Sequence, residues 1–292
     1  NLGLTLVGET VEAVSGTPYA DYVHANILGP LGLDDTRVGI PAQLYGQQMA
    51  VGWGALEADG ARPEVGLFDP AGITPAAGFT ASVADLAKFA SWTFRLASSG
   101  EEEVLRPSTL REMQRVHYIS PDWETSWGLG FSVRQEGGTT VVGHGGACPG
   151  YRSALMLAPS ESMGVAVAMN AMDDPGGIAR GIAALVKARG EAAPFDPVAG
   201  VDLADYAGVY SGQPWDSDFM LIPWAGGLTW LDPDAVEPVR ALWRLKPLGG
   251  DRFRVVTDKG AEREAVTFER DAAGQVRAIR RHANLSPRLR GL

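Results

Sequence analysis

Cysteine is almost absent from this sequence, since Cys148 is the only one among 292 residues. A single cysteine excludes an internal disulfide, so cysteine usage leaves the cellular compartment open. A lone thiol can also serve as a nucleophile. Cys148, however, lies in a glycine-rich segment, and the resemblance described below assigns no chemical role to this position. We therefore expect Cys148 to have no catalytic role.

Basic residues are also scarce, with 25 Lys and Arg against 35 Asp and Glu, a formal charge of −10 and a pI near 4.9. Binding to the phosphates of nucleic acids requires clustered positive charge, so the composition argues against a nucleic-acid partner. The basic residues that do cluster stand near the C-terminus, where we expect a solvated barrel edge: Arg277, Arg280, Arg281, Arg288 and Arg290.

The sequence also lacks signatures of other classes. No apolar run approaches the eighteen or so residues that span a bilayer, so we predict no membrane span in this chain. His24, His117 and His282 form no metal-ligand spacing, and no phosphate-binding loop or dinucleotide fingerprint occurs. The sequence therefore predicts neither a metal nor another cofactor.

The first 190 or so residues predict helices followed by an antiparallel meander. Apolar residues at helical spacing precede Gly16, and Ser82 with Asp85 forms a potential capping box for a helix that ends before Gly100. From Trp127 to Arg134 the period changes to two, which predicts one strand. Further strands are expected at 139–142, 153–157 and 164–169, and then a helix that carries Ile178, Ile182, Leu185 and Val186 on its apolar side.

The sequence pattern changes after a Pro-containing linker at 190–200. Seven short strand-like runs separated by Gly-rich turns predict a small, closed or nearly closed antiparallel barrel. Four tryptophans in this region are expected to fill the barrel interior rather than to line a ligand cavity: Trp215, Trp224, Trp230 and Trp243. The predicted domains are 1–195 and 200–292.

One segment stands out for chemistry, Gly143-His144-Gly145-Gly146-Ala147-Cys148-Pro149-Gly150. Its four glycines indicate close approach or an unusual turn of the backbone. A histidine there can donate or accept a proton, and exposed N–H groups at a sheet edge can stabilise an oxyanion. A structural histidine in a glycine-rich turn would have the same local sequence.

Several ordered segments resemble the serine hydrolases of the β-lactamase and penicillin-binding type. The run from Asn1 to Tyr19 is similar to the helix after the Tyr-x-Asn motif of class C-like members. The resemblance continues at 27–36, at 75–89, at Trp127-Gly128-Leu129-Gly130-Phe131, and at Gly143-His144-Gly145-Gly146 with Pro149-Gly150-Tyr151. From Asp202 onward the chain is similar to the lipocalin-like barrel appended to some members.

The resemblance implies an α+β fold: a β-lactamase-like domain of helices packed on an antiparallel sheet, N-terminally incomplete, followed by a lipocalin-like barrel. It also implies site roles. Asn1 would hydrogen-bond the substrate amide or the catalytic Lys, and His144 would replace the Lys of Lys-Thr-Gly, orienting the base Tyr and binding the polar end of the substrate. Gly145, Gly146 and Ala147 would form the substrate and oxyanion wall.

The family's nucleophilic Ser-x-x-Lys and its Tyr would precede Asn1. We therefore expect this chain to form an acyl-enzyme only with an upstream segment or a second chain as partner. The expected substrate is a small ester, an amide or a D-amino-acid peptide, because a histidine in place of Lys weakens the grip on a β-lactam carboxylate. Two alternatives stay open: a catalytically silent sensor or scaffold, and a protein that binds a ligand through the barrel.

Overall fold

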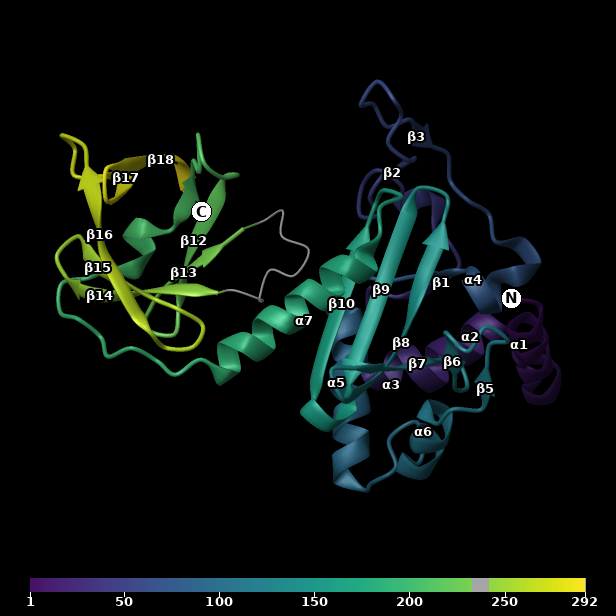
Figure 1. The fold of residues 1–292 in the computed structure, drawn as a ribbon. Coiled ribbons are helices and arrows are strands. Elements are labelled where there is room, and N and C mark those ends of the chain that lie inside the picture. The colour runs from purple at the N-terminus through teal and green to yellow at the C-terminus, as the bar shows by residue number, and fades with distance from the viewer. Residues whose placement is uncertain (233–241, 292) are drawn as a thin grey trace. The chain divides into compact units, whose positions relative to one another are not determined.

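The computed structural model describes residues 1–232 and 242–291. The chain divides into two compact units, Asn1–Ala183 and Ala184–Leu292. The first contains helices and a six-stranded antiparallel sheet with strand order β10-β9-β8-β7-β6-β5, and the second contains a closed eight-stranded barrel (Figure 1). The predicted combination of an α+β domain and a small barrel is confirmed.

The first unit opens with helices. They are α1 (Leu2–Ser15), α2 (Tyr19–Val23), the continuing π-helical turn His24–Leu28, α3 (Gly29–Leu31), α4 (Thr74–Ala77), α5 (Val83–Ser99) and α6 (Pro107–Gln114). As predicted, α1 ends at Gly16, which adopts the left-handed conformation, and Ser82 caps α5 by accepting a hydrogen bond from the Asp85 N–H. The connection between α3 and α5 contains two short ladders. They are β1 (Arg37–Val38) with β4 (Phe79–Thr80) and β2 (Gly52–Trp53) with β3 (Glu64–Val65).

The carboxylate of Asp85 does not complete the capping box. It is buried and accepts hydrogen bonds from the Asp35 N–H at 2.8 Å, from the Thr36 hydroxyl at 2.9 Å and from Lys88 Nζ at 3.0 Å. Burial opposes ionisation of this carboxyl, but the hydrogen bonds from Lys88, Thr36 and Asp35 lower its pKa. Asp85 therefore ties α5 to the segment that follows α3.

The sheet comprises β5 (Tyr118–Ile119), β6 (Ser126–Trp127), β7 (Ser132–Glu136), β8 (Thr139–Cys148), β9 (Tyr151–Ala158) and β10 (Met163–Met169). One face packs on α5, where Ala90 and Phe94 meet Phe131, Val142 and Leu157. The other face packs on the first half of α7 (Pro175–Glu191) through Ala179 and Ala183. The sheet is thus covered by a helix on each side (Figure 1).

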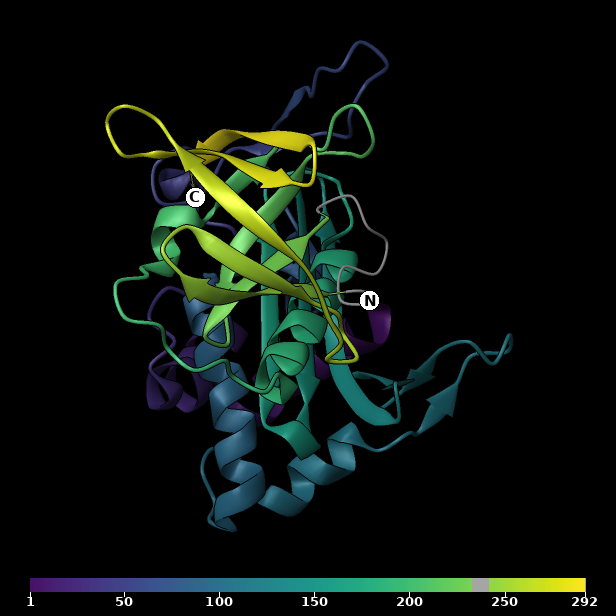
Figure 2. The ribbon, with the colours of Figure 1, turned by 60° about the vertical axis from the view of Figure 1, so that its left-hand side comes forward.

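Two predictions for this unit were wrong. The expected single strand at Trp127–Arg134 is two strands, because the chain turns at Gly128–Phe131, where the Gly128 N–H donates to the Phe131 carbonyl. The β5–β6 hairpin then extends outward from the rest of the unit (Figure 2). In α7, Ile178 and Ile182 are exposed, and the small alanines on the neighbouring face make the contact with the sheet.

The barrel is formed by β11 (Gly208–Tyr210), β12 (Phe219–Trp224), β13 (Gly227–Leu231), β14 (Trp243–Gly249), β15 (Arg252–Val256), β16 (Glu262–Arg270), β17 (Val276–Arg281) and β18 (Asn284–Gly291). Sequence reasoning found the first seven runs and missed β18, which pairs with both β17 and β11 and closes the barrel. Arg277, Arg280, Arg281, Arg288 and Arg290 accordingly lie in barrel strands.

The barrel interior is filled by its own side chains. Twelve residues, each at most 4% exposed, form one cluster: Tyr206, Tyr210, Phe219, Leu221, Leu228, Leu245, Phe253, Val255, Val266, Phe268, Val276 and Ile279. Only part of the tryptophan expectation holds. Trp230 and Trp243 pack against this cluster, whereas Trp224 lies in a second cluster with Leu185 and Ala188, and Trp215 is 74% exposed.

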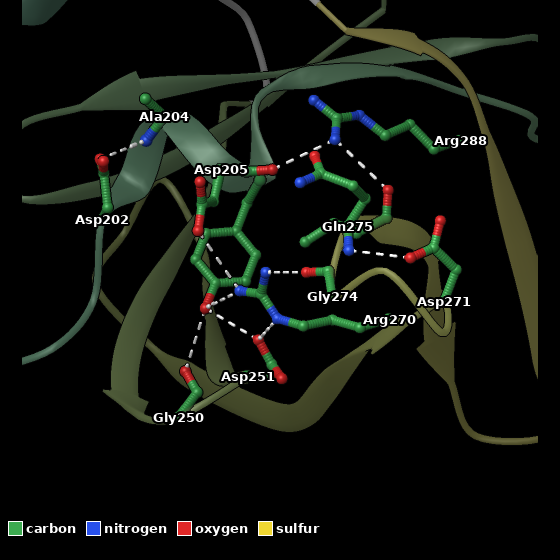
Figure 3. A network of polar contacts seen from close by, with 12 residues as sticks. Asp202, Ala204, Asp205, Gly250, Asp251, Arg270, Asp271, Gly274, Gln275 and Arg288 are labelled. Carbon is green, nitrogen blue, oxygen red and sulfur yellow. Dashed lines mark hydrogen bonds and ion pairs between the residues drawn. The ribbon is translucent and has the colours of Figure 1, made fainter.

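A polar network of the barrel unit joins the 3-10 turn Leu203–Tyr206 to the barrel strands (Figure 3). The Tyr206 hydroxyl donates to Asp251 at 2.9 Å, and Arg270 Nε donates to the same carboxylate oxygen at 2.9 Å. Arg270 also donates to the Gly274 carbonyl at 2.8 Å. These contacts give the polar ends of Tyr206 and Arg270 their hydrogen-bond partners and connect the turn to Asp251 and to β16.

Candidate functional site

The glycine-rich segment is not a turn after a strand but the second half of β8 itself. β9 pairs with β8 from Val142 to Cys148, whereas β7 pairs with β8 only as far as Gly143. Beyond Gly143, β8 therefore has a neighbour on one side only. This exposes the backbone from His144 to Cys148 along the other side of the strand.

The register determines which backbone groups point to that open side. The hairpin between Cys148 and Tyr151 has two central residues, so this pair exchanges backbone hydrogen bonds and every second pair back along the ladder does the same. The backbone groups of His144 and Gly146 are thereby directed to β9, and those of Gly145 and Ala147 away from it. Two backbone N–H groups, at positions 145 and 147, therefore face the open side of β8.

Glycine is required at one point of this strand, Gly143, and at Gly146 a larger residue would displace the Ser153 side chain. A Cβ at Gly143 would lie 1.9 Å from the Leu155 carbonyl oxygen, which is backbone and cannot give way, and a Cβ at Gly146 would lie 2.4 Å from Ser153 Oγ. Gly145 has more room, with its nearest neighbour, the Ser153 carbonyl oxygen, at 3.5 Å. The glycines thus allow β8 and β9 to approach closely at the candidate site.

His144 is an exposed side chain with two defined contacts. Its Nδ1 lies 2.6 Å from the Gly145 carbonyl oxygen, and its ring centroid lies 5.8 Å from that of Trp127 at an interplanar angle of 49°. Trp127 belongs to β6 and is half-buried. Both contacts restrict the orientation of the imidazole at the open side of β8.

His144, Gly145, Gly146 and Ala147 line one pocket of about 350 Å³ within the first unit. The structure thus brings together four of the five site residues predicted from the sequence. Asn1 is not among the residues lining this pocket. It precedes α1, and its carbonyl accepts a hydrogen bond from the Thr5 N–H at 3.0 Å.

Sequence reasoning missed the charged residues of this pocket, Arg134, Arg152, Asp174 and Arg180. Asp174 accepts a hydrogen bond from the Gly176 N–H at 2.9 Å at the start of α7. That bond, a second from the Gly177 N–H and the nearby Arg180 and Arg152 outweigh partial desolvation and lower the pKa of Asp174. The signal in the sequence was Asp174-Pro175, a residue pair typical of a helix start.

The neighbouring residues support the strand rather than supply chemistry. Burial raises the pKa of the Cys148 thiol, which keeps it protonated and disfavours a nucleophilic role. The Tyr151 hydroxyl donates to the Ala50 carbonyl at 2.6 Å, and the Trp53 N–H donates to the Asn170 carbonyl at 2.9 Å. These bonds attach the connection between α3 and α5 to the sheet beside the site.

Residues 1–232 and 242–291 contain neither a candidate metal site nor a membrane-spanning helix. No three His, Cys, Asp or Glu side chains in these ranges are grouped so that they could hold a metal ion. No helix in the same ranges combines the length and the apolar character needed to cross a bilayer.

Comparison with known proteins gives the family. The profile described as Beta-lactamase matches residues 1–189. A D-aminopeptidase of Cereibacter sphaeroides (strain ATCC 17023) is 27% identical over 171 residues, which are 58% of this chain and 31% of that protein.

Solved structures agree in fold. The octameric penicillin-binding protein homologue from Pyrococcus abyssi matches 99% of this chain and 63% of its own, with a TM-score of 0.57 and 21% identity. A class C β-lactamase from Rhodobacter sphaeroides matches 63% of this chain and 58% of its own, with a TM-score of 0.50 and 17% identity.

A sheet covered by helices, with a glycine-rich strand that leaves a histidine and two backbone N–H groups exposed on its unpaired side, is thus the arrangement of a β-lactamase-like domain. The chain belongs to the Beta-lactamase family, and the match covers residues 1–189. It spans 31% of the length of the D-aminopeptidase.

Proposed function

We propose that this chain is part of a serine hydrolase that acts through an acyl-enzyme on ester or amide substrates. The observation that carries the proposal is the open half of β8, where His144 is exposed and the N–H groups of Gly145 and Ala147 point to the side that β7 leaves free. Backbone N–H groups fixed in a strand are donors of the kind that stabilise a developing oxyanion.

In this proposal the nucleophilic Ser of a Ser-x-x-Lys motif comes from polypeptide outside residues 1–292, either an upstream segment or a second chain. The Ser oxygen attacks the substrate carbonyl, a tetrahedral oxyanion forms, and the amine or alcohol leaves to give the acyl-enzyme. Water then attacks the acyl carbonyl and releases the acid and the free Ser. The Ala147 N–H donates to the oxyanion, and Asn1 donates a hydrogen bond to the substrate amide or assists the Lys.

His144 has the role of binding the polar end of the substrate and orienting the base. Similarity to a D-aminopeptidase supports D-amino-acid amides or peptides as the substrate class. The filled barrel interior gives no support to a function in which the barrel encloses a ligand, so we assign the barrel an indirect role.

The test compares residues 1–292 alone with the same chain supplied with the polypeptide encoded immediately upstream. We expect the chain alone to leave a p-nitrophenyl ester and a D-amino-acid p-nitroanilide intact, and the supplemented chain to hydrolyse at least one of them. Saturable hydrolysis by residues 1–292 alone would contradict the missing-nucleophile proposal. An inactive supplemented chain whose upstream part carries no Ser-x-x-Lys would favour the silent sensor or scaffold.

A further inference from the structure

The contact between His144 and Gly145 determines where the imidazole carries its proton. A backbone carbonyl oxygen can only accept a hydrogen bond, so Nδ1, which lies 2.6 Å from the Gly145 oxygen, must be the protonated nitrogen. In the neutral ring the other nitrogen, Nε2, is then unprotonated and offers a lone pair. The Gly145 carbonyl is able to make this bond because it lies on the open side of β8, where β7 no longer pairs.

Trp127 keeps the imidazole in this orientation. The two rings are within the range of favourable aromatic contact at a centroid distance of 5.8 Å. Trp127 itself is fixed by the sheet: its residue pairs with Ser132 of β7 and with Tyr118 of β5, and its carbonyl accepts the His117 N–H at 2.8 Å. An exposed imidazole that packs on an indole on one side has fewer rotamers available than a histidine in a bare strand.

We propose that Trp127 is a positioning residue, and that Trp127 and the Gly145 carbonyl together present Nε2 of neutral His144 as a hydrogen-bond acceptor. In its neutral form the ring therefore receives an N–H or O–H donor of the substrate, such as an ammonium, amide or hydroxyl group, and not a carboxylate. This deepens the proposed hydrolase function and rests on it for the meaning of the bound group, whereas the tautomer is a property of the chain itself.

The first experiment measures the tautomer in residues 1–292. Long-range ¹H–¹⁵N spectra of the ring-labelled protein, at a pH where the ring is neutral, separate the two forms, and His144→Gln assigns the signal among the four histidines. We expect Nδ1–H to be the major form. An equal mixture or a major Nε2–H form would overturn the proposal and would leave the hydrolase proposal standing.

The second experiment tests Trp127. Trp127→Ala should shift the His144 tautomers toward Nε2–H, and Trp127→Phe should preserve the wild-type ratio, because a ring still packs on the imidazole. Trp215→Ala, a change of a tryptophan that is 74% exposed in the other unit, serves as the matched control. An unchanged ratio in folded Trp127→Ala would contradict the positioning role, and the Phe variant gives the comparison if the Ala variant does not fold.

The third experiment tests the class of ligand with two probes of similar apolar part at millimolar concentration. D-phenylalanine amide offers N–H donors, and 3-phenylpropanoate offers only a carboxylate. We expect the first probe alone to move the Nε2 resonance of His144. A shift caused by 3-phenylpropanoate, or no shift with either probe, would overturn the assignment of a donor group. If all three results are as expected but the complete enzyme hydrolyses neither test substrate, the hydrolase proposal is overturned and the tautomer proposal stands.

Discussion

The two units of the chain use their apolar residues in different ways. The barrel buries a continuous cluster of aromatic and aliphatic side chains, whereas α1 of the first unit leaves Leu2, Leu6, Val7 and Val14 more than half exposed. The barrel closes its strands on one another, whereas the sheet of the first unit leaves the second half of β8 paired on one side only. The barrel has neither an unfilled interior nor an unpaired strand edge that could bind a substrate among the described residues. The candidate site therefore lies in the first unit, where β8 has unpaired backbone groups.

The largest effect is expected from a cavity in the barrel core. Phe253 is fully buried and makes edge contacts with Tyr206 at 4.9 Å and Phe268 at 5.2 Å. Phe253→Ala should therefore lower the free energy of unfolding of the barrel by about 3–5 kcal/mol, measured by denaturant titration. Trp215→Ala is the control and should stay within about 0.5 kcal/mol of the wild type. Similar losses in the two variants would mean that the barrel is not packed as described.

A smaller effect is expected from alkaline pH, through Tyr210. Burial raises the pKa of Tyr210 to about 12, although Arg288 nearby acts in the opposite direction, and its hydroxyl donates to the Tyr206 carbonyl at 2.7 Å. A folded-state pKa above the unfolded value of 10.0 means that the fold favours the neutral phenol. This contribution is complete below pH 10 and is lost as the pH rises toward 12.

The loss should amount to about 2–3 kcal/mol, at 1.36 kcal/mol for each unit of pKa. Denaturant titrations of the wild type and of Tyr210→Phe at several values between pH 9 and pH 12 would measure it. The Phe variant should show a flatter dependence, because it has no phenol to ionise. Identical slopes for the two proteins would show that Tyr210 is not the group responsible.

The smallest effect concerns residues 190–200, which lie within the second unit. We propose that residues 1–195 and 200–292 are the two domains and that proteases cut between Gly190 and Gly200 without unfolding the barrel. Cleavage should lower the stability of the barrel slightly, because it loosens contacts on the outside of the barrel and not in its interior. These contacts are the packing of Leu185, Ala188 and Ala192 and the hydrogen bond from the Phe195 N–H to the Ala225 carbonyl at 2.8 Å. Limited proteolysis followed by mass spectrometry would give the sites, and first cuts inside barrel strands would contradict the division.

The sequence predicted those elements whose signals are local. Helix ends at Gly16 and Gly100 follow from the left-handed conformation that glycine adopts readily. β18 was missed because its charged residues and Pro287 do not resemble a strand, and its place is set by pairing with β11 and β17. Tertiary pairing of this kind has no local signature.

The site was predicted in part for the same reason. His144, Gly145, Gly146 and Ala147 are adjacent in sequence, so a single motif identified them together. Trp127, Arg152 and Arg180 come to the same region only through the order of strands and the position of α7. The helix marked by Ile178 and Ile182 does lie on the sheet, but the close approach of α7 favours the alanines at 179 and 183 in the contact and leaves both isoleucines exposed.

His144→Ala in the complete enzyme tests most directly whether the open half of β8 is catalytic. Loss of a positioned acid–base group should lower kcat/KM for a small ester by about 10²-fold or more. The melting temperature should change little, because the side chain is exposed and its hydrogen bond is to its neighbour in the chain. Wild-type kcat/KM in the variant, or a loss of activity matched by an equal loss of thermal stability, would contradict the claim.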